Sequence, residues 1–128
     1  PNDFMGLGNP NLVPYQIVYY AMKTGVDRAR ASTSPINAFT HTRIGTSTPA
    51  VYAKDSHGPD KFRTWIQDFD YGGDYDAADV RAQIQASYDA GVMDWMVWAP
   101  SNRYTRGAYL DAGAVAITTL QPVSETAF

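Results

Sequence analysis

The chain of 128 residues contains no cysteine. It therefore has no disulfide framework and no thiolate that could act in catalysis or bind a metal. The lack of cysteine is compatible with export, and we expect the protein to be extracytoplasmic or secreted. The chain begins at Pro1, with no Met and no signal-like segment before it, so we also expect a processed or partial product.

Positive charge and long apolar runs are also scarce. Ten Lys and Arg against 13 Asp and Glu give a net charge of −3, and the basic residues do not cluster. Nucleic acids and acidic membrane surfaces bind basic patches, so neither is expected as the main partner. The apolar runs are far shorter than the roughly 20 residues of a membrane span.

Common metal and cofactor motifs are missing too. His41 and His57 stand far apart, and although Asp55 lies near His57, such isolated histidines are poor evidence of a metal site. The GxGxxG, P-loop, HExxH and GxSxG patterns are absent. We therefore predict neither a metal nor a cofactor.

Aromatic side chains are abundant instead. Nine Tyr, five Phe and three Trp make up 13% of the chain. A well-packed core would explain them. A surface or cleft that binds flat, partly apolar ligands such as sugar rings would explain them equally well, because aromatic rings offer rigid contact area.

The first half of the chain is uneven in character. Residues 1–14 are rich in Gly, Pro and Asn and predict a loop. Apolar side chains at helical spacing over residues 15–30 predict a helix. Residues 31–60 are rich in Ser, Thr, Pro and Gly without periodicity, which indicates an inserted or irregular segment, either a long loop or a short hairpin.

Residues 61–104 predict a strand, a helix and a second strand. The first strand covers Phe62 to Ile66 and the second lies within residues 92–100. Asp76 is the predicted N-cap of a helix over residues 77–90. A short connection from this helix to the second strand is typical of parallel α/β architecture.

Two strands and two helices cannot cover both faces of a parallel sheet. Either residues 31–60 and 114–120 add strands, or the chain is part of a larger barrel. In the C-terminal segment, residues 105–128, the stretch 114–120 is compatible with a strand or with a turn of helix.

Polar and aromatic residues gather where the two predicted strands end. Asp68 and Asp70 follow the first strand, while Trp98 ends the second and precedes Asn102 and Tyr104. Parallel strands bring these residues to one edge of the sheet, where ligands of α/β folds bind. A carboxylate there can act as acid, base or nucleophile if a second one lies at a suitable distance.

Simpler roles remain open for both carboxylates. Asp68 could cap a loop or pair with Arg63 or Arg103, and Asp70 before two glycines is ordinary turn chemistry.

The tryptophans differ in the side of the strand that they occupy. Trp95 and Trp98 face opposite sides because side chains alternate along a strand, and we predict that Trp98 lies at the site. Gln67 shares the side of Trp65, so both are candidates for the same interior surface. Core packing is the alternative for Trp65.

Three stretches resemble a known family. "FRTWIQDFDYG" and "YDAADVRAQIQASYDAGVMDWMVWAPSNRY" are similar to the last third of the glycoside hydrolase domain family DUF4015. "NPNLVPYQIVYYAM" resembles the helix after the sixth strand of that family. Its members resemble (β/α)8-barrel glycosidases. Two positions depart from the family pattern: Thr64 replaces a Pro, and Ala99 stands where Asn is usual.

The resemblance implies an α/β fold that forms the C-terminal portion of a TIM-barrel-like (β/α)8 domain. Phe62 to Asp68 would be the seventh barrel strand, and Met93 to Trp98 the eighth. The resemblance would place Gln67, Asp68 and Trp98 at the catalytic mouth. From the positions at the strand end, we predict Asp68 as the catalytic carboxylate and Asp70 as a possible second acid. Sugar would be bound by Trp65, Gln67, Trp98, Asn102 and Tyr104.

A complete barrel of this kind needs about 250 residues. We therefore expect a C-terminal part that works with a missing N-terminal barrel segment or with another chain, and that could lack activity alone. Three functions remain open: part of a glycoside hydrolase acting on polysaccharide or oligosaccharide, a non-catalytic carbohydrate-binding or structural module of the same fold, and a small flavodoxin-like domain with residues 114–120 as a central strand.

Overall fold

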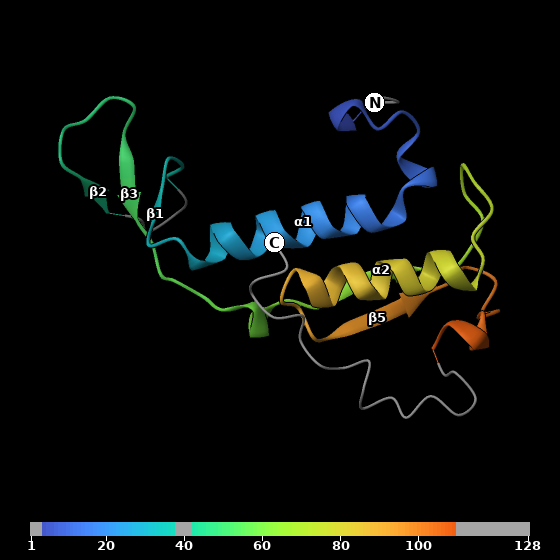
Figure 1. Ribbon diagram of the computed structural model, residues 1–128. Coiled ribbons are helices and arrows are strands. Elements are labelled where there is room, and N and C mark those ends of the chain that lie inside the picture. Colours follow the sequence, from blue (N-terminus) through green and yellow to red (C-terminus); the bar gives the residue numbers. More distant parts are fainter. Residues whose placement is uncertain (1–3, 38–41, 110–128) are drawn as a thin grey trace.

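Two long helices, a parallel pair of strands and a small antiparallel sheet make up the computed structural model, which describes residues 4–37 and 42–109 (Figure 1). The fold is therefore mixed α/β, as the sequence predicted. The described residues form no closed barrel. The predicted strand or turn at 114–120 lies outside them.

Helix α1 spans Pro14–Arg30, against 15–30 predicted. Pro14 suits the first helical position because its fixed φ is already helical and its missing N–H would have no partner there. Gly25 does not interrupt the helix. A Cβ at Gly25 would lie 3.1 Å from Cε1 of Phe62, so glycine lets the helix approach that ring closely. The stretch before α1 contains two short 3-10 turns, Phe4–Gly6 and Pro10–Leu12, where a loop was predicted.

Helix α2 spans Ala77–Asp89 and begins at the predicted cap. The Asp76 carboxylate accepts hydrogen bonds from the backbone N–H groups of Ala78 and Asp79, at 2.7 and 3.1 Å. The Asp79 side chain accepts from the backbone N–H of Asp76 in return, which completes a capping box. Gly91, with φ of +86°, follows the helix in the left-handed conformation that favours glycine.

Strands β4 (Thr64–Gln67) and β5 (Trp95–Trp98) form the parallel pair, with α2 connecting them. The register runs from Thr64 opposite Trp95 to Gln67 opposite Trp98. This confirms the predicted strand–helix–strand unit. Both strands are shorter than predicted, because the ladder forms only where the two segments run side by side.

The third unit is a small antiparallel sheet within residues 31–60. It contains β1 (Thr33–Ser34), β2 (Arg43–Ile44) and β3 (Val51–Ala53), with β3 in the centre. This sheet lies beyond the C-terminal end of α1, away from the parallel pair (Figure 1). The segment is thus neither a plain loop nor a simple hairpin.

The end of α1 is closed by the chain that leaves the small sheet. The Lys54 amine donates a hydrogen bond to the carbonyl of Ala29 at 2.9 Å, and the Ser56 hydroxyl donates to that of Arg30 at 2.6 Å. The last carbonyls of a helix have no partner within it, so these bonds satisfy two of them.

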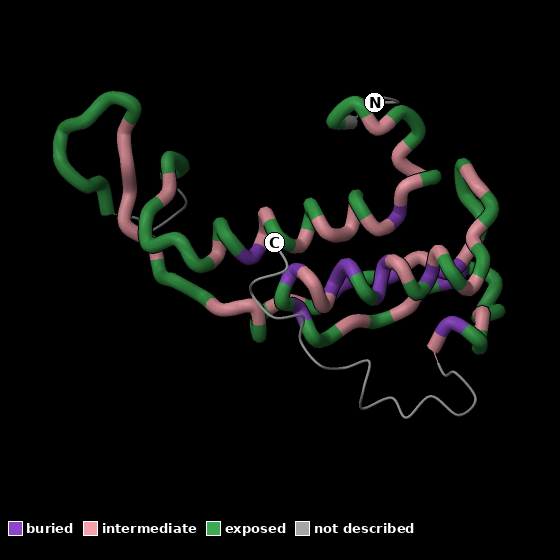
Figure 2. Tube along the Cα trace, viewed as in Figure 1, coloured by how far each residue is buried: buried purple, intermediate pink, exposed green. Residues whose placement is uncertain are grey.

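The core lies between α2 and one face of the parallel pair. Its buried members are Ile66, Val80, Ile84 and Ala108, and partly buried side chains surround them. Buried residues follow α2 and the segments beneath it, whereas the strands of the small sheet contain only intermediate and exposed residues (Figure 2). Helix α1 is joined to α2 by the Tyr15 hydroxyl, which donates to the Asp89 carboxylate at 2.6 Å.

The cap of α2 provides a test of this local structure. Asp76→Ala should lower the free energy of unfolding by about 1 kcal/mol, because two helix N–H groups lose their acceptor. Urea denaturation measures the change. Asp74→Ala removes the same charge from an exposed position two residues earlier and should stay within about 0.5 kcal/mol of the parent. Equal losses in the two variants would contradict the capping role.

Candidate functional site

Side chains on β4 separate onto two faces. Thr64, Ile66 and Asp68 are buried, with Ile66 in the core beneath α2. Trp65 and Gln67 point the other way, and Trp65 is 66% exposed. The strand therefore has one face committed to packing and one open face.

Strand β5 divides in the same way. Trp95 packs against the core, and its indole N–H donates to the Tyr88 hydroxyl at 2.8 Å. Met96 and Trp98 lie on the opposite face, with Trp98 47% exposed. The predicted opposite orientation of Trp95 and Trp98 is confirmed.

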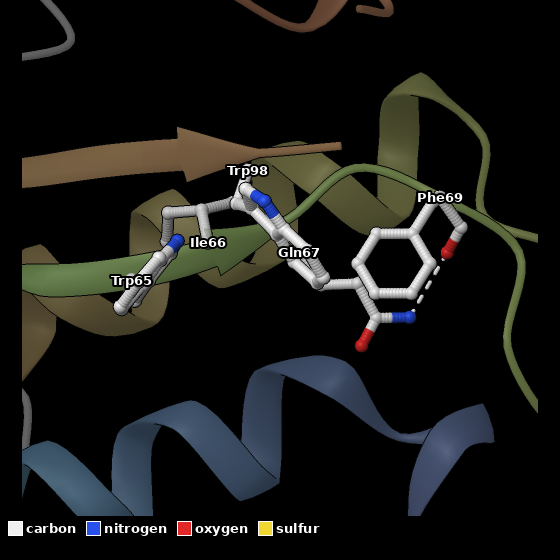
Figure 3. A pocket seen from close by; sticks show the side chains of 5 residues that line it. All are labelled: Trp65, Ile66, Gln67, Phe69 and Trp98. Atoms are coloured by element: carbon white, nitrogen blue, oxygen red, sulfur yellow. Dashed lines mark hydrogen bonds between the residues drawn. The ribbon is translucent and has the colours of Figure 1, made fainter. Parts of the chain in front are cut away.

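The open face carries a pocket of about 500 Å³ toward the carboxyl ends of the two strands. Its lining residues are Trp65, Ile66, Gln67, Phe69 and Trp98 (Figure 3). The Trp65 and Trp98 rings meet edge to face with centroids 6.4 Å apart, and Phe69 meets Trp98 likewise at 5.1 Å. Edge-to-face contacts of this kind fix the rings relative to one another.

Gln67 is the polar member of the lining, and its backbone is held by Gln83 of α2. The Gln83 side chain is buried, accepts from the Gln67 N–H at 3.0 Å and donates to the Gln67 carbonyl at 2.8 Å. The Gln67 side-chain NH₂ donates to the carbonyl of Phe69 at 2.9 Å (Figure 3). The amide is thereby oriented, since a flipped amide would set two acceptors against each other.

Asp68 lies on the buried face, and its carboxylate is fully engaged. It is 4% exposed and accepts from the backbone N–H and the hydroxyl of Thr105, both at 2.7 Å, and from the Tyr109 hydroxyl. Burial acts to raise the pKa of Asp68, but the hydrogen bonds from Tyr109 and Thr105 outweigh it and hold that pKa below its ordinary value. This carboxylate anchors the segment after β5 to the end of β4.

Asp70 is exposed and has a turn role. Its carboxylate accepts from the backbone N–H of Tyr75 at 2.7 Å and so closes the loop that leads to α2. Neither Asp70 nor Asp68 is among the residues that line the pocket. The catalytic roles predicted for them stay predictions.

Comparison with known protein families decides what kind of domain carries this site. The family model described as "Putative glycosyl hydrolase domain", DUF4015, matches residues 1–104. The chain belongs to this family. Searches among curated proteins and among solved structures found no match. The matched range includes both helices, both sheets and every lining residue of the pocket, so family membership connects this part of the DUF4015 chain with carbohydrate chemistry.

Asn102 and Tyr104 lie on the loop after β5 of the DUF4015 chain and do not line the pocket. Asn102 adopts a left-handed φ of +54° and donates its backbone N–H to the carbonyl of Ala99 at 3.0 Å, which makes a tight turn. Tyr104 is 43% exposed. Their predicted contacts with substrate therefore remain predictions.

No group of three His, Asp or Glu side chains able to hold a metal occurs within residues 4–37 and 42–109. The backbone N–H of His57 donates to the carbonyl of Ala29, and His41 lies outside the described residues. In the same ranges, no helix has the length and apolar character needed to cross a membrane.

Several residues at the site of this DUF4015 chain were not predicted from the sequence. Phe69 had a usable signal, since it continues the alternation of Trp65 and Gln67. Gln83 was only weakly indicated by the sequence, as an amide on an otherwise apolar helix face. Thr105 and Tyr109 had no signal, because they meet Asp68 across 37 and 41 residues of chain.

The Asp68 anchor makes a prediction about stability. Tyr109→Phe should cost about 2 kcal/mol of unfolding free energy at neutral pH, because it removes a hydrogen bond to a buried carboxylate. Tyr104→Phe is the matched control at an exposed position of the same loop and should change little. If Tyr104→Phe lowered the free energy of unfolding as much as Tyr109→Phe, the hydrogen bond from Tyr109 to Asp68 would not be what stabilises this segment.

The same contact predicts a dependence on pH. The folded-state pKa of Asp68 is lowered, so its contribution is complete above its ordinary pKa of about 3.9 and disappears as the pH falls through the lower folded value. Burial and the Asp68 carboxylate raise the pKa of Tyr109, so its contribution is complete below about pH 10 and disappears as the pH rises through the raised folded value. Asp68→Asn should flatten the acid limb of a stability–pH curve. Parallel acid limbs for wild type and Asp68→Asn would contradict this.

Proposed function

We propose that this chain forms the sugar-binding face of a glycoside hydrolase that acts on polysaccharide or oligosaccharide. The observation that carries the proposal is the pocket on the open face of β4 and β5. Three aromatic rings and one oriented amide converge there, at the ends of parallel strands where α/β folds bind ligands. Membership of the glycosyl hydrolase family supports the same conclusion.

The composition of the pocket suits a sugar ring. A pyranose has an apolar C–H face that packs on an aromatic ring and hydroxyl groups at its rim that need hydrogen bonds. Trp65, Phe69 and Trp98 offer ring surface, and the Gln67 amide offers a polar contact. A volume of about 500 Å³ lies within the range of small-ligand sites, so a short saccharide can be accommodated.

Hydrolysis of a glycosidic bond needs two suitably placed carboxyl groups. Asp68 is buried and engaged by Thr105 and Tyr109, and Asp70 closes a turn. We therefore assign Asp68 a positioning role, in which it holds the loop that carries Asn102 and Tyr104. The reacting carboxylates of this proposal come from further barrel strands or from another chain.

The parallel pair supports the addition of further strands. Parallel sheets are normally covered on both faces, but α2 covers only one face of β4 and β5. The register directs the backbone N–H and C=O groups of Trp65 away from β5, toward the outer edge of β4. A neighbouring strand could pair at that edge beside Trp65, whereas Gln83 already binds the backbone groups of Gln67 there.

A non-catalytic carbohydrate-binding module is the second candidate. The engagement of both carboxylates favours it, since a binding module needs the aromatic face but no free acid. The two functions differ in one assay, the release of reducing ends from polysaccharide by the chain together with any partner. Release indicates the hydrolase, whereas binding without release indicates the module.

Trp98→Ala tests the sugar-binding face itself. The variant removes the ring that contacts both Trp65 and Phe69, so oligosaccharide binding measured by calorimetry should weaken at least about tenfold, or about 1.4 kcal/mol. Tyr71→Ala is the matched control, because Tyr71 is an exposed aromatic near β4 that does not line the pocket. Equal affinity of Trp98→Ala and the parent would refute binding at this face.

A further inference from the structure

We propose that the pocket selects neutral sugar units and discriminates against units that carry a carboxylate or sulfate group. This inference rests on the proposed sugar-binding function and names the class of substrate. It follows from the groups that line the pocket and from the charges around it.

Among the residues that the structure describes, the lining contains no ionisable side chain. Trp65, Phe69 and Trp98 supply apolar ring surface, and the only polar atoms on these three side chains are the two indole N–H donors. Gln67 adds a neutral amide. Recognition of a carboxylate or sulfate usually depends on Arg or Lys, and the described residues place neither in the lining.

The Gln67 amide presents an acceptor. Its NH₂ is bound to the Phe69 carbonyl, and Figure 3 shows its side-chain oxygen directed away from that bond. A sugar hydroxyl can donate a hydrogen bond to this oxygen. An ionised carboxylate has no proton to donate, so it would set acceptor against acceptor.

The surrounding charges act in the same direction. Asp68 lies between Gln67 and Phe69 in the chain and is ionised at neutral pH, while Asp70 follows Phe69 and is exposed. Both are negative, as is the chain as a whole, with net charge −3. Each would raise the energy of an anion in the pocket, since like charges repel more strongly near the protein interior than in water.

The nearest basic groups of the strands and of the following loop do not offset this. Arg63 pairs with Asp94 at 2.7 Å, at the amino ends of β4 and β5 and so at the opposite end from Gln67 and Trp98. Arg103 is exposed on the loop after β5 and does not line the pocket. Among the described residues, the pocket is thus lined by uncharged side chains, and two carboxylates, Asp68 and Asp70, flank Phe69 in the chain.

The test compares matched oligosaccharides that differ in charge. The full chain is titrated by calorimetry with cellohexaose, xylohexaose and mannohexaose, and with hexamers of galacturonic, mannuronic and glucuronic acid, in about 0.1 M salt where the Debye length is about 10 Å. Trp98→Ala is titrated with every binder. We expect a neutral hexamer to bind at least about tenfold more tightly than any acidic one, and its binding to weaken at least about tenfold in Trp98→Ala.

Other results overturn the inference in distinguishable ways. An acidic hexamer that binds as tightly as the neutral ones, or more tightly, and that is lost in Trp98→Ala would refute neutral selection while the sugar-binding function stands. Binding that survives Trp98→Ala would place the sugar elsewhere and refute both. Absence of binding by all six hexamers would also refute both.

Discussion

The parallel pairing of β4 and β5 is the constraint on which the rest of the structure depends. Because side chains alternate along a strand, the register determines which side chains lie on each of the two faces. The register that buries Ile66 beneath α2 also brings Trp65 and Gln67 beside Trp98 on the open face. A slip by one residue would exchange the core with the pocket, so the stability of the core enforces the geometry of the site.

Buried polar contacts secure the ends of this pair to the rest of the chain. Gln83 reaches from α2 to both backbone groups of Gln67, and Asp68 gathers Thr105 and Tyr109 from the segment after β5. Each joins a residue at the strand end to a different element. Such groups are costly to bury without partners, so they resist any shift of the strand end that would break their bonds. The contacts of Gln83 and Asp68, which lie outside the pocket lining, therefore keep the pocket rigid.

Apart from the parallel pairing of β4 and β5, the features that the sequence predicted correctly were local. The apolar period of α1, the cap at Asp76 and the alternation that separates Trp95 from Trp98 all depend on neighbours within a few residues, and the structure has each of them. The burial of Asp68 depends on Thr105 and Tyr109, which lie far along the chain, and no local sequence pattern predicts these contacts. The small sheet was missed for another reason, since strands of two or three residues are too short to show a period.

Resonances of the three indole N–H groups test the central claim, that one face of the parallel pair is core and the other binds sugar. In a ¹⁵N-labelled chain, addition of a binding oligosaccharide should shift the signals of Trp65 and Trp98, which line the pocket. The Trp95 signal should stay in place, because its N–H donates to Tyr88 on the core face. A shift of Trp95 as large as those of Trp65 and Trp98, or a shift of Trp95 alone, would contradict the account.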